Sequence, residues 1–209
     1  MGVDNSQPML SKARALASDL ANVRFEACDL AAWSPDGAID VVYSNAALHW
    51  LPDHASLFPR LARAVADGGV LAVQMPRNFD APSHVAVAEV ATTGRWRARL
   101  ASLVRPAPVA GPEAYLRWLA PHCAAVDIWE TSYLQRLAPR DDGEHPVVAF
   151  VSGTWLLPFF ERLGDDGEAR RDFLGDYRER IARAYPREAD GSSLFPFRRL
   201  FVVAVAGSR

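Results

Sequence analysis

The chain has 209 residues, of which 50% are hydrophobic and 23% are charged, a composition typical of one globular domain with a substantial core. Its 23 basic and 25 acidic residues give a formal net charge of -2, and the arginines lie among acids, as in "DYRERIARAYPRE", so we expect no nucleic-acid partner. Two distant cysteines exclude a disulfide framework, and no apolar run reaches the roughly 18 residues of a membrane span; we expect a cytoplasmic protein.

The first elements alternate between helical and strand patterns. "GV" before Asp4 reads as the end of a buried strand, and apolar spacing in "SKARALASDLA" predicts a helix from about Gln7. "VRFEACDL" alternates like a half-covered strand. "AIDVVYSNAALHW" opens with β-branched residues, which indicates a buried strand followed by a loop. "PDHASLFPRLARAVADGG" predicts a helix that ends at Gly68 and is bent or restarted at Pro59.

The second half mixes long helical blocks with strands. "GVLAVQMP" predicts a further strand, and short apolar runs separated by helices indicate an α/β fold with a largely parallel sheet. We expect helical residues at 80–104, a proline-rich connector from Pro106 to Pro112, a strand in "AAVDIWETSYLQRL", and a broken helix in "EHPVVAFVSGTWLLPFFERL". "EARRDFLGDYRERIARAY" predicts a helix and "RRLFVVAVAG" a final strand. The chain therefore reads as one domain, 1–209, in which helical segments at about 77–123 and 138–185 cover a pocket.

Polar side chains follow three of the expected strands. Asp4, Asp29 and Asn45 each stand at a carboxyl end, which is where open α/β sheets bind ligands. A carboxylate there can accept both hydrogen bonds from the ribose hydroxyls of a nucleotide. Each acid also has a local alternative, because Asp4 suits a helix N-cap and Asp29 suits a turn.

Taken in order, "GVDNSQPML", "FEACDL", "DVVYSNAALHWLPD" and "GGVLAVQMP" resemble successive motifs of class I S-adenosylmethionine-dependent methyltransferases. A closer resemblance, to the trans-aconitate methyltransferases, runs through "NAALHWLPDH", "GGVLAVQMPRNFDAPSH", "GTWLLPFF", "FLGDYRERIARAYP" and "FPFRRLFVVAVA". It covers nearly the whole chain. It implies a Rossmann-like sheet of seven strands with the last one antiparallel, and helices on both faces.

The resemblance also implies a binding site for S-adenosylmethionine. In it, Asp4 holds the ribose hydroxyls, with Asn5 and Met9 beside the adenosine. Asp29 takes the adenine amino group, and Leu30 packs nearby. These residues come from the ends of the first two expected strands.

The loop after the third strand is implied to hold the reacting end of the cofactor. Asn45 lies next to the methionine moiety, and His49 and Trp50 stand over the methyl donor as the catalytic residues. A carboxylate acceptor is already ionised at neutral pH, so His49 is interpreted as a positioning group and not as a base. Its alternative is a loop histidine that caps the following helix.

The implied reaction is methyl transfer to a carboxylate of a small polycarboxylic acid, with trans-aconitate as acceptor and a methyl ester as product. Arg suits such an acceptor, because its planar fork matches a carboxylate. The candidate acceptor-binding residues are Arg77, Asn78, Tyr133, Trp155 and Arg198. No cluster of His, Cys and acids has ligand spacing, so no metal is expected.

One family feature is missing from the sequence. Class I methyltransferases carry an acid-x-Gly-x-Gly-x-Gly loop after their first strand, and the 13 glycines here never form that pattern. We therefore expect the first strand and its loop to precede Met1, and the strand "IDVVYS" to lack a partner and to promote aggregation. Two alternatives stay open: an inactive methyltransferase-like remnant, and a methyltransferase for another small molecule. The full-length enzyme is expected to be a monomer.

Overall fold

The computed structural model describes residues 1–35, 37 and 39–207. They form two compact units. The first consists of Met1–Met75, Pro108–Trp129 and Leu200–Arg209, and the second of Pro76–Ala107 and Glu130–Arg199. The expected helical segments at 77–123 and 138–185 contribute most of the second unit, while residues 108–123 belong to the first.

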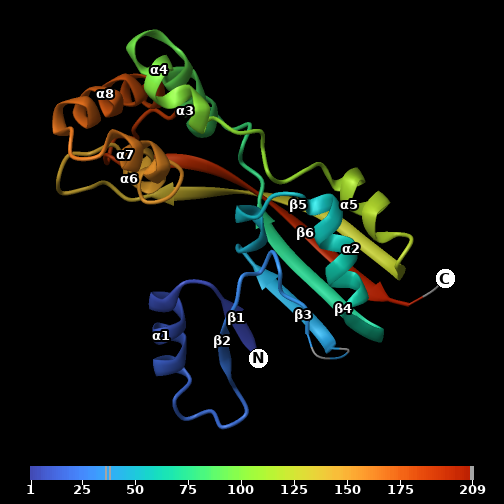
Figure 1. The fold of residues 1–209 in the computed structure, drawn as a ribbon. Helices are drawn as coiled ribbons and strands as arrows, with labels where there is room; N and C mark the ends of the chain where they lie inside the picture. Colours follow the sequence, from blue (N-terminus) through green and yellow to red (C-terminus); the bar gives the residue numbers. More distant parts are fainter. Residues whose placement is uncertain (36, 38, 208–209) are drawn as a thin grey trace. The chain divides into compact units, whose positions relative to one another are not determined.

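The first unit begins with a small βαβ arrangement. Strands β1 (Gly2–Asp4) and β2 (Phe25–Ala27) pair in parallel, and helix α1 (Gln7–Leu16) connects them (Figure 1). The predicted start of the helix at Gln7 is confirmed. The helix ends at Leu16, before the end of the apolar pattern. Ser and Asp follow at positions 18 and 19, and such residues compete with helical hydrogen bonds through their own side chains.

A separate sheet has the strand order β3-β4-β6-β5. Strand β3 (Ile39–Asn45) is parallel to β4 (Val65–Pro76), and Asn45 is in register with Gln74. Strands β5 (Cys123–Leu137) and β6 (Ser193–Ala206) contribute residues to both units. Figure 1 draws β6 in the direction opposite to β4, so the expected antiparallel last strand is confirmed. The described residues hold six strands in two sheets, not the implied seven in one.

Strand β3 is less buried than its sequence predicts. Val42 is buried, but Val41 and Tyr43 are 56% and 73% exposed. Among the described residues β3 pairs along one edge only, with β4, and it therefore lies at the margin of its sheet. The prediction of a fully buried strand was wrong, because one edge and one face of β3 have no cover in the described part of the chain. The first residue of the predicted run, Ala38, lies outside the described residues.

Helix α2 (His54–Arg63) ends earlier than predicted. The chain enters β4 at Val65, which pairs with Ile39, so Gly68 lies inside the strand. The expectation that the helix ends at Gly68 was wrong, because the β-branched Val65 is recruited into the sheet. Pro59 is accommodated within one continuous helix. The remaining α-helix of this unit in the described residues, α5 (Pro112–Leu119), begins with its proline in the first turn, where a missing N–H costs nothing.

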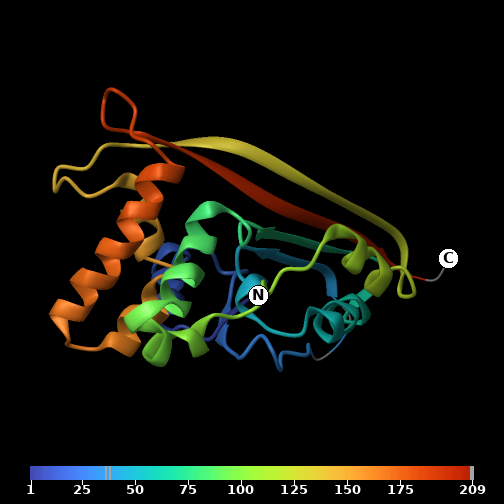
Figure 2. The ribbon, with the colours of Figure 1, turned by 90° about the horizontal axis from the view of Figure 1, so that it is seen from above.

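The second unit is mostly helical. Its elements are α3 (Pro82–Thr92), η2 (Gly94–Trp96), α4 (Arg97–Leu100), η3 (Ala101–Leu103), α6 (Pro146–Ser152), α7 (Leu157–Leu163) and α8 (Gly167–Ala184). Figure 2 shows α8 beside α3, and the Tyr177 hydroxyl donates to the Ser83 carbonyl across this contact at 3.0 Å. Val87, Phe173 and Phe195 belong to the buried core of the unit. The predicted break between α6 and α7 is confirmed.

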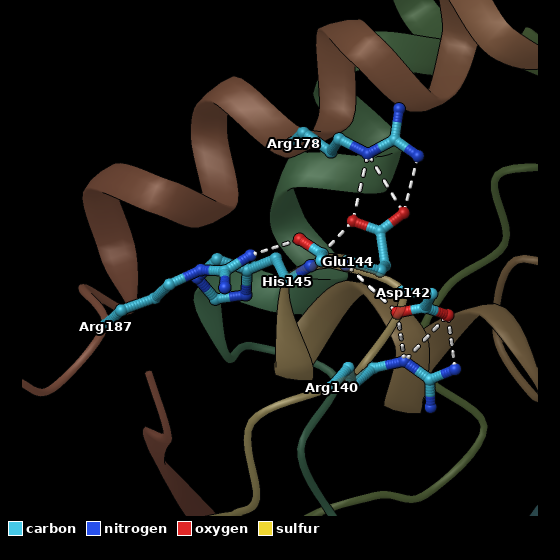
Figure 3. A network of polar contacts seen from close by, with 7 residues as sticks. Arg140, Asp142, Glu144, His145, Arg178 and Arg187 are labelled. Atoms are coloured by element: carbon cyan, nitrogen blue, oxygen red, sulfur yellow. Dashed lines mark hydrogen bonds and ion pairs between the residues drawn. The ribbon is translucent and has the colours of Figure 1, made fainter. Parts of the chain in front are cut away.

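A network of charges fixes the connection between β5 and α6 to helix α8 (Figure 3). The Arg178 guanidinium donates to both carboxylate oxygens of Glu144, and Arg187 donates to the Gly143 carbonyl at 2.8 Å. Arg140 makes a bidentate contact with Asp142 in the same loop. The Arg178 contact holds the pKa of Glu144 below its usual range, although burial opposes this most strongly. The loop is therefore held by α8 and by the segment that follows it.

Candidate functional site

The two acids at the strand ends have local hydrogen bonds. An Asp4 oxygen accepts from the Ser6 N–H at 2.7 Å, and an Asp29 oxygen accepts from the Ala31 N–H at 2.9 Å. Both contacts are turns in which an acid accepts from the N–H two residues on. The turn considered for Asp29 is present, whereas Asp4 is not the helix cap, because the N-cap of α1 is Ser6. Each contact uses one carboxylate oxygen. The second oxygen of each acid has no hydrogen bond within the described residues, which leaves it available to a ligand.

A cleft of about 840 Å³ lies in the first unit, between the two sheets. Its lining comes from β1, the segment after β2, and β3, and it includes Gly2, Leu30 and Asn45. The Ser44 hydroxyl in this lining is buried and has no hydrogen-bond partner in the described part of the chain. Cofactor clefts usually measure about 300–1,000 Å³ and present a few such polar groups.

The predicted cofactor residues fall into two groups. Leu30 and Asn45 line the cleft. Asp4, Asn5, Met9 and Asp29 lie in the same unit but outside that lining, and Met9 is 56% exposed. The structure thus brings two of the six into the cleft itself and places the others around the ends of β1 and β2.

His49 and Trp50 lie in a short helical turn, η1 (Leu48–Trp50), after β3. Their rings are 4.6 Å apart; His49 is buried, whereas Trp50 is 59% exposed. His49 does not cap helix α2, since the cap is Asp53, whose carboxylate accepts from the Ser56 N–H at 3.3 Å. The capping alternative for His49 is therefore excluded.

The backbone around this turn is strained. Ala46 (φ 51°) and Asp53 (φ 54°) are the non-glycine residues with a left-handed backbone in the described part of the chain, and they bracket the turn on both sides. Left-handed conformations are unfavourable for residues with a Cβ, and they often occur at functional sites.

A series of buried hydrogen bonds holds the same turn in place. His54 Nε2 lies 3.0 Å from the Leu48 carbonyl oxygen, which can only accept, so Nε2 carries the proton. Nδ1 is then an acceptor, and the Tyr115 hydroxyl donates to it at 2.6 Å. The Ala110 N–H donates to the Tyr115 oxygen at 3.2 Å. Burial lowers the pKa of His54, in keeping with a neutral ring. The sequence analysis did not predict these hydrogen bonds, although His54 is the last residue of the motif "NAALHWLPDH".

In the second unit, Asn78 and Arg198 meet at a cavity of about 510 Å³. The Asn78 side-chain oxygen accepts from the Arg198 backbone N–H at 2.6 Å, and the Arg198 side chain donates from Nε to the Arg77 carbonyl at 3.0 Å. Arg198 also forms an ion pair with Asp80, which lowers the pKa of that carboxyl group. Arg77 itself contacts Glu130 at 2.7 Å.

The other two predicted acceptor residues lie elsewhere in this unit. Trp155 packs against Phe79 and His84 and lines a second cavity of about 290 Å³. The Tyr133 hydroxyl accepts from Arg199 Nε at 3.1 Å on an exposed face of β5. Of the five predicted residues, Asn78 and Arg198 thus share a cavity, and Arg77 is joined to them through hydrogen bonds. Asp80 was not predicted.

Across the described part of the chain, no group of three or more His, Cys, Asp or Glu side chains is arranged to hold a metal ion. None of the helices that the structure describes combines the length and apolar character needed to cross a membrane.

The chain was compared with known protein families and relatives. Residues 1–73 match the methyltransferase domain family. A trans-aconitate 2-methyltransferase of Azoarcus sp. is 43% identical over 98% of this chain and 77% of its own length. The enzyme of the same name from Methylobacterium nodulans is 44% identical over 98% of the chain and 76% of its length. The chain belongs to the trans-aconitate 2-methyltransferase family.

Solved structures agree on the fold of this family member. The YcgJ protein of Bacillus subtilis superimposes with a TM-score of 0.57 at 13% identity, covering 100% of this chain and 82% of that one. A phosphoethanolamine N-methyltransferase of Haemonchus contortus, in complex with S-adenosylhomocysteine, gives 0.50 at 15% identity, with 99% and 43% of the two chains covered. The predicted class I, Rossmann-like fold is confirmed.

Proposed function

We propose that the protein transfers a methyl group from S-adenosylmethionine to a carboxylate of trans-aconitate, giving a methyl ester. The observation that carries the proposal is the 43% identity to a trans-aconitate 2-methyltransferase over 98% of the chain. At this identity the match extends through the second unit, which carries the candidate acceptor residues, and not only through residues 1–73. The identity therefore supports the proposed acceptor as well as the cofactor.

The residues present fit the cofactor. The cleft between β1, β2 and β3 has a suitable volume, and the buried Ser44 hydroxyl there lacks a protein partner in the described residues. Asp4 would bind the ribose hydroxyls through its second oxygen, and Asn5 and Met9 would lie beside the adenosine. Asp29 would accept from the adenine amino group, with Leu30 packed nearby.

The turn after β3 would position the reacting end. Asn45 would contact the methionine moiety, and His49 and Trp50 would enclose the methyl donor as the proposed catalytic residues. When bound, S-adenosylmethionine supplies a sulfonium methyl group, to whose carbon an acceptor oxygen bonds as the carbon–sulfur bond breaks and its electron pair remains on sulfur. The chain's contribution is alignment and exclusion of water. The acceptor carboxylate needs no base, because it is ionised at neutral pH.

The acceptor side would be formed by the second unit. Asn78 and Arg198 line one cavity, Arg77 is joined to Arg198 by a hydrogen bond, and Trp155 and Tyr133 complete the proposed set. We further propose that the full-length enzyme works in the cytoplasm as a monomer without a membrane partner. Its balanced charge of 23 basic and 25 acidic residues supports the absence of a nucleic-acid partner.

The test is an acceptor panel with isotopically labelled methyl donor. Purified protein, S-adenosylmethionine and trans-aconitate should yield a labelled monomethyl ester by mass spectrometry, together with an equal amount of S-adenosylhomocysteine. Citrate and a monocarboxylate of similar size serve as comparison acceptors. Ester formation from the monocarboxylate but not from trans-aconitate would overturn the proposed acceptor.

A further inference from the structure

We propose that the cavity beside Asn78 and Arg198 binds one carboxylate of a polycarboxylate acceptor, and that this carboxylate takes the place that Asp80 holds on the Arg198 guanidinium. The inference rests on the proposed function, because it assigns a carboxylate subsite to the acceptor named there. It adds Asp80 as a residue that competes with the acceptor and so sets its affinity. All of the residues concerned belong to the second unit.

The first observation is a buried donor without a partner. Asn78 is 4% exposed, and it lines the cavity. Its amide orientation is fixed, because the Arg198 N–H can only donate and so requires the side-chain oxygen. The amide nitrogen Nδ2 therefore faces away from that contact, and within the described residues it has no acceptor. Buried donors of this kind are rare in proteins and call for an explanation; a ligand oxygen supplies one.

The second observation is a cation that is held in place but exposed at its end. Arg198 donates from Nε to the Arg77 carbonyl, so its guanidinium plane is oriented by the backbone. Its Nη2 atom contacts Asp80, and its side chain is 30% exposed. A guanidinium fixed in this way offers a planar fork to a carboxylate, the geometry that distinguishes Arg from Lys.

The third observation concerns how easily Asp80 can leave. Its side chain is 71% exposed and it lies in the segment just before α3. Exposed ion pairs contribute little, since water solvates the separated charges well. An incoming carboxylate that meets both Arg198 and the Asn78 amide gains a hydrogen bond that Asp80 does not make. The charge in direct contact with the Arg198 guanidinium is unchanged, because one carboxylate replaces another.

The subsite has a consequence for selectivity. In the proposed subsite the contacts to the Arg198 guanidinium and to the Asn78 amide engage both oxygens of one carboxylate. The methyl group is therefore accepted by a different carboxylate of the same molecule. The cavity is also bordered by Glu188, which disfavours any further negative charge within it. The subsite therefore takes one carboxylate and selects for acceptors that carry at least two.

The experiment is calorimetric titration of trans-aconitate into the protein without a methyl donor. Asp80→Asn should tighten binding at least fivefold, because the competing charge is removed while the side chain keeps its shape. Asn78→Asp should weaken it at least tenfold, since an oxygen still accepts from the Arg198 N–H but the Nδ2 donor becomes an anion. The matched control is Asp142→Asn, an exposed acid paired with Arg140 in the same unit, which should leave affinity unchanged.

The results distinguish failure of the carboxylate subsite from failure of the proposed function. Should Asp80→Asn leave the affinity unchanged or weaken it, the subsite is wrong, and this holds even if Asn78→Asp fails to fold, because Asp80 is on the surface. The absence of measurable binding of both trans-aconitate and citrate to the parent and to Asp80→Asn also overturns it. Failure of the proposed function looks different: the affinity for polycarboxylates responds to Asp80→Asn, but no methyl ester of trans-aconitate forms. If trans-aconitate is methylated and its KM is unchanged in both Asp80→Asn and Asn78→Asp, the subsite is rejected while the proposed function stands.

Discussion

The Tyr115 hydroxyl lies 2.6 Å from Nδ1 of His54, and both side chains are buried. The other ring nitrogen of His54 donates to the Leu48 carbonyl, at the start of the turn that carries His49 and Trp50. The Leu48 carbonyl thus determines which nitrogen of His54 carries its proton, and a hydroxyl from α5, a helix distant in sequence, satisfies the other nitrogen. The ring in turn holds a candidate catalytic turn in place.

Tyr115→Phe removes this hydroxyl and leaves Nδ1 of His54 buried without its donor. We expect the free energy of unfolding to fall by about 1–3 kcal/mol, the usual range for a buried acceptor left unsatisfied. Chemical denaturation measures it. Tyr133→Phe is the control, because that hydroxyl is on an exposed face and its loss should change stability by less than about 0.5 kcal/mol. Equal effects of the two substitutions would contradict the proposed role of the buried contact.

Stability should fall between neutral pH and pH 4. Burial lowers the pKa values of His54, His145 and His84, the last to about 4, against about 6.5 in an unfolded chain. Between these values the unfolded chain binds more protons, so the free energy of unfolding rises with pH. The contribution is complete above pH about 6.5 and is lost as the pH falls toward 4. In His84→Gln the slope across this window should be shallower, as denaturation at a series of pH values would reveal; identical slopes would rule out His84 as a source.

The strained turn gives a test in which stability and activity separate. Ala46→Gly relieves a left-handed alanine, a strain of about 1–2 kcal/mol, against about 0.5–1 kcal/mol for the added freedom of the unfolded chain. We expect equal or higher stability, with lower methyl transfer because the turn is less restrained. Ala47→Gly, where φ is −121°, lacks that relief and should lose about 0.5–1 kcal/mol. Thermal melts measure the stability of each variant, and initial rates measure its methyl transfer. A destabilised Ala46→Gly protein would refute the strain argument.

Asp4 can be tested for both of its roles with two substitutions. Asp4→Asn keeps an oxygen for the Ser6 N–H but loses the charge that would bind the ribose, so stability should hold while affinity for S-adenosylmethionine drops at least tenfold. Asp4→Ala should lose the same affinity and also about 1 kcal/mol of stability, because the Ser6 N–H loses its acceptor. Calorimetric titration and denaturation provide the two readouts. If affinity survives in Asp4→Asn, Asp4 serves only the turn before α1.

The sequence predicted the elements whose signals are local. The start of α1 near Gln7 was predicted from apolar spacing, the break between α6 and α7 from an interrupted helical pattern, and α8 from its helical pattern. Resemblance predicted the fold class and the family. These features depend on neighbours in the sequence or on motifs long enough to be specific.

What the sequence could not predict depends on partners distant along the chain. Val41 and Tyr43 look like core residues by type, and only the pairing of β3 shows them to be exposed. Asp80 and Arg198 are 118 positions apart, and no local pattern indicates that they form an ion pair. The same holds for Tyr115 and His54, whose contact requires α5 to lie against α2. Such interactions arise from the packing of helices and strands.

Strand β3 has one more property that follows from its unpaired edge. Its outward face carries Val41 and Tyr43, and within the described residues its backbone donors and acceptors are satisfied on the β4 side only. An edge of this kind accepts an extended peptide by main-chain hydrogen bonding, with the alternating side chains providing selectivity. Strand β3 is therefore suited to complementation in trans: a separate, short β-branched segment should dock beside it and raise the melting temperature.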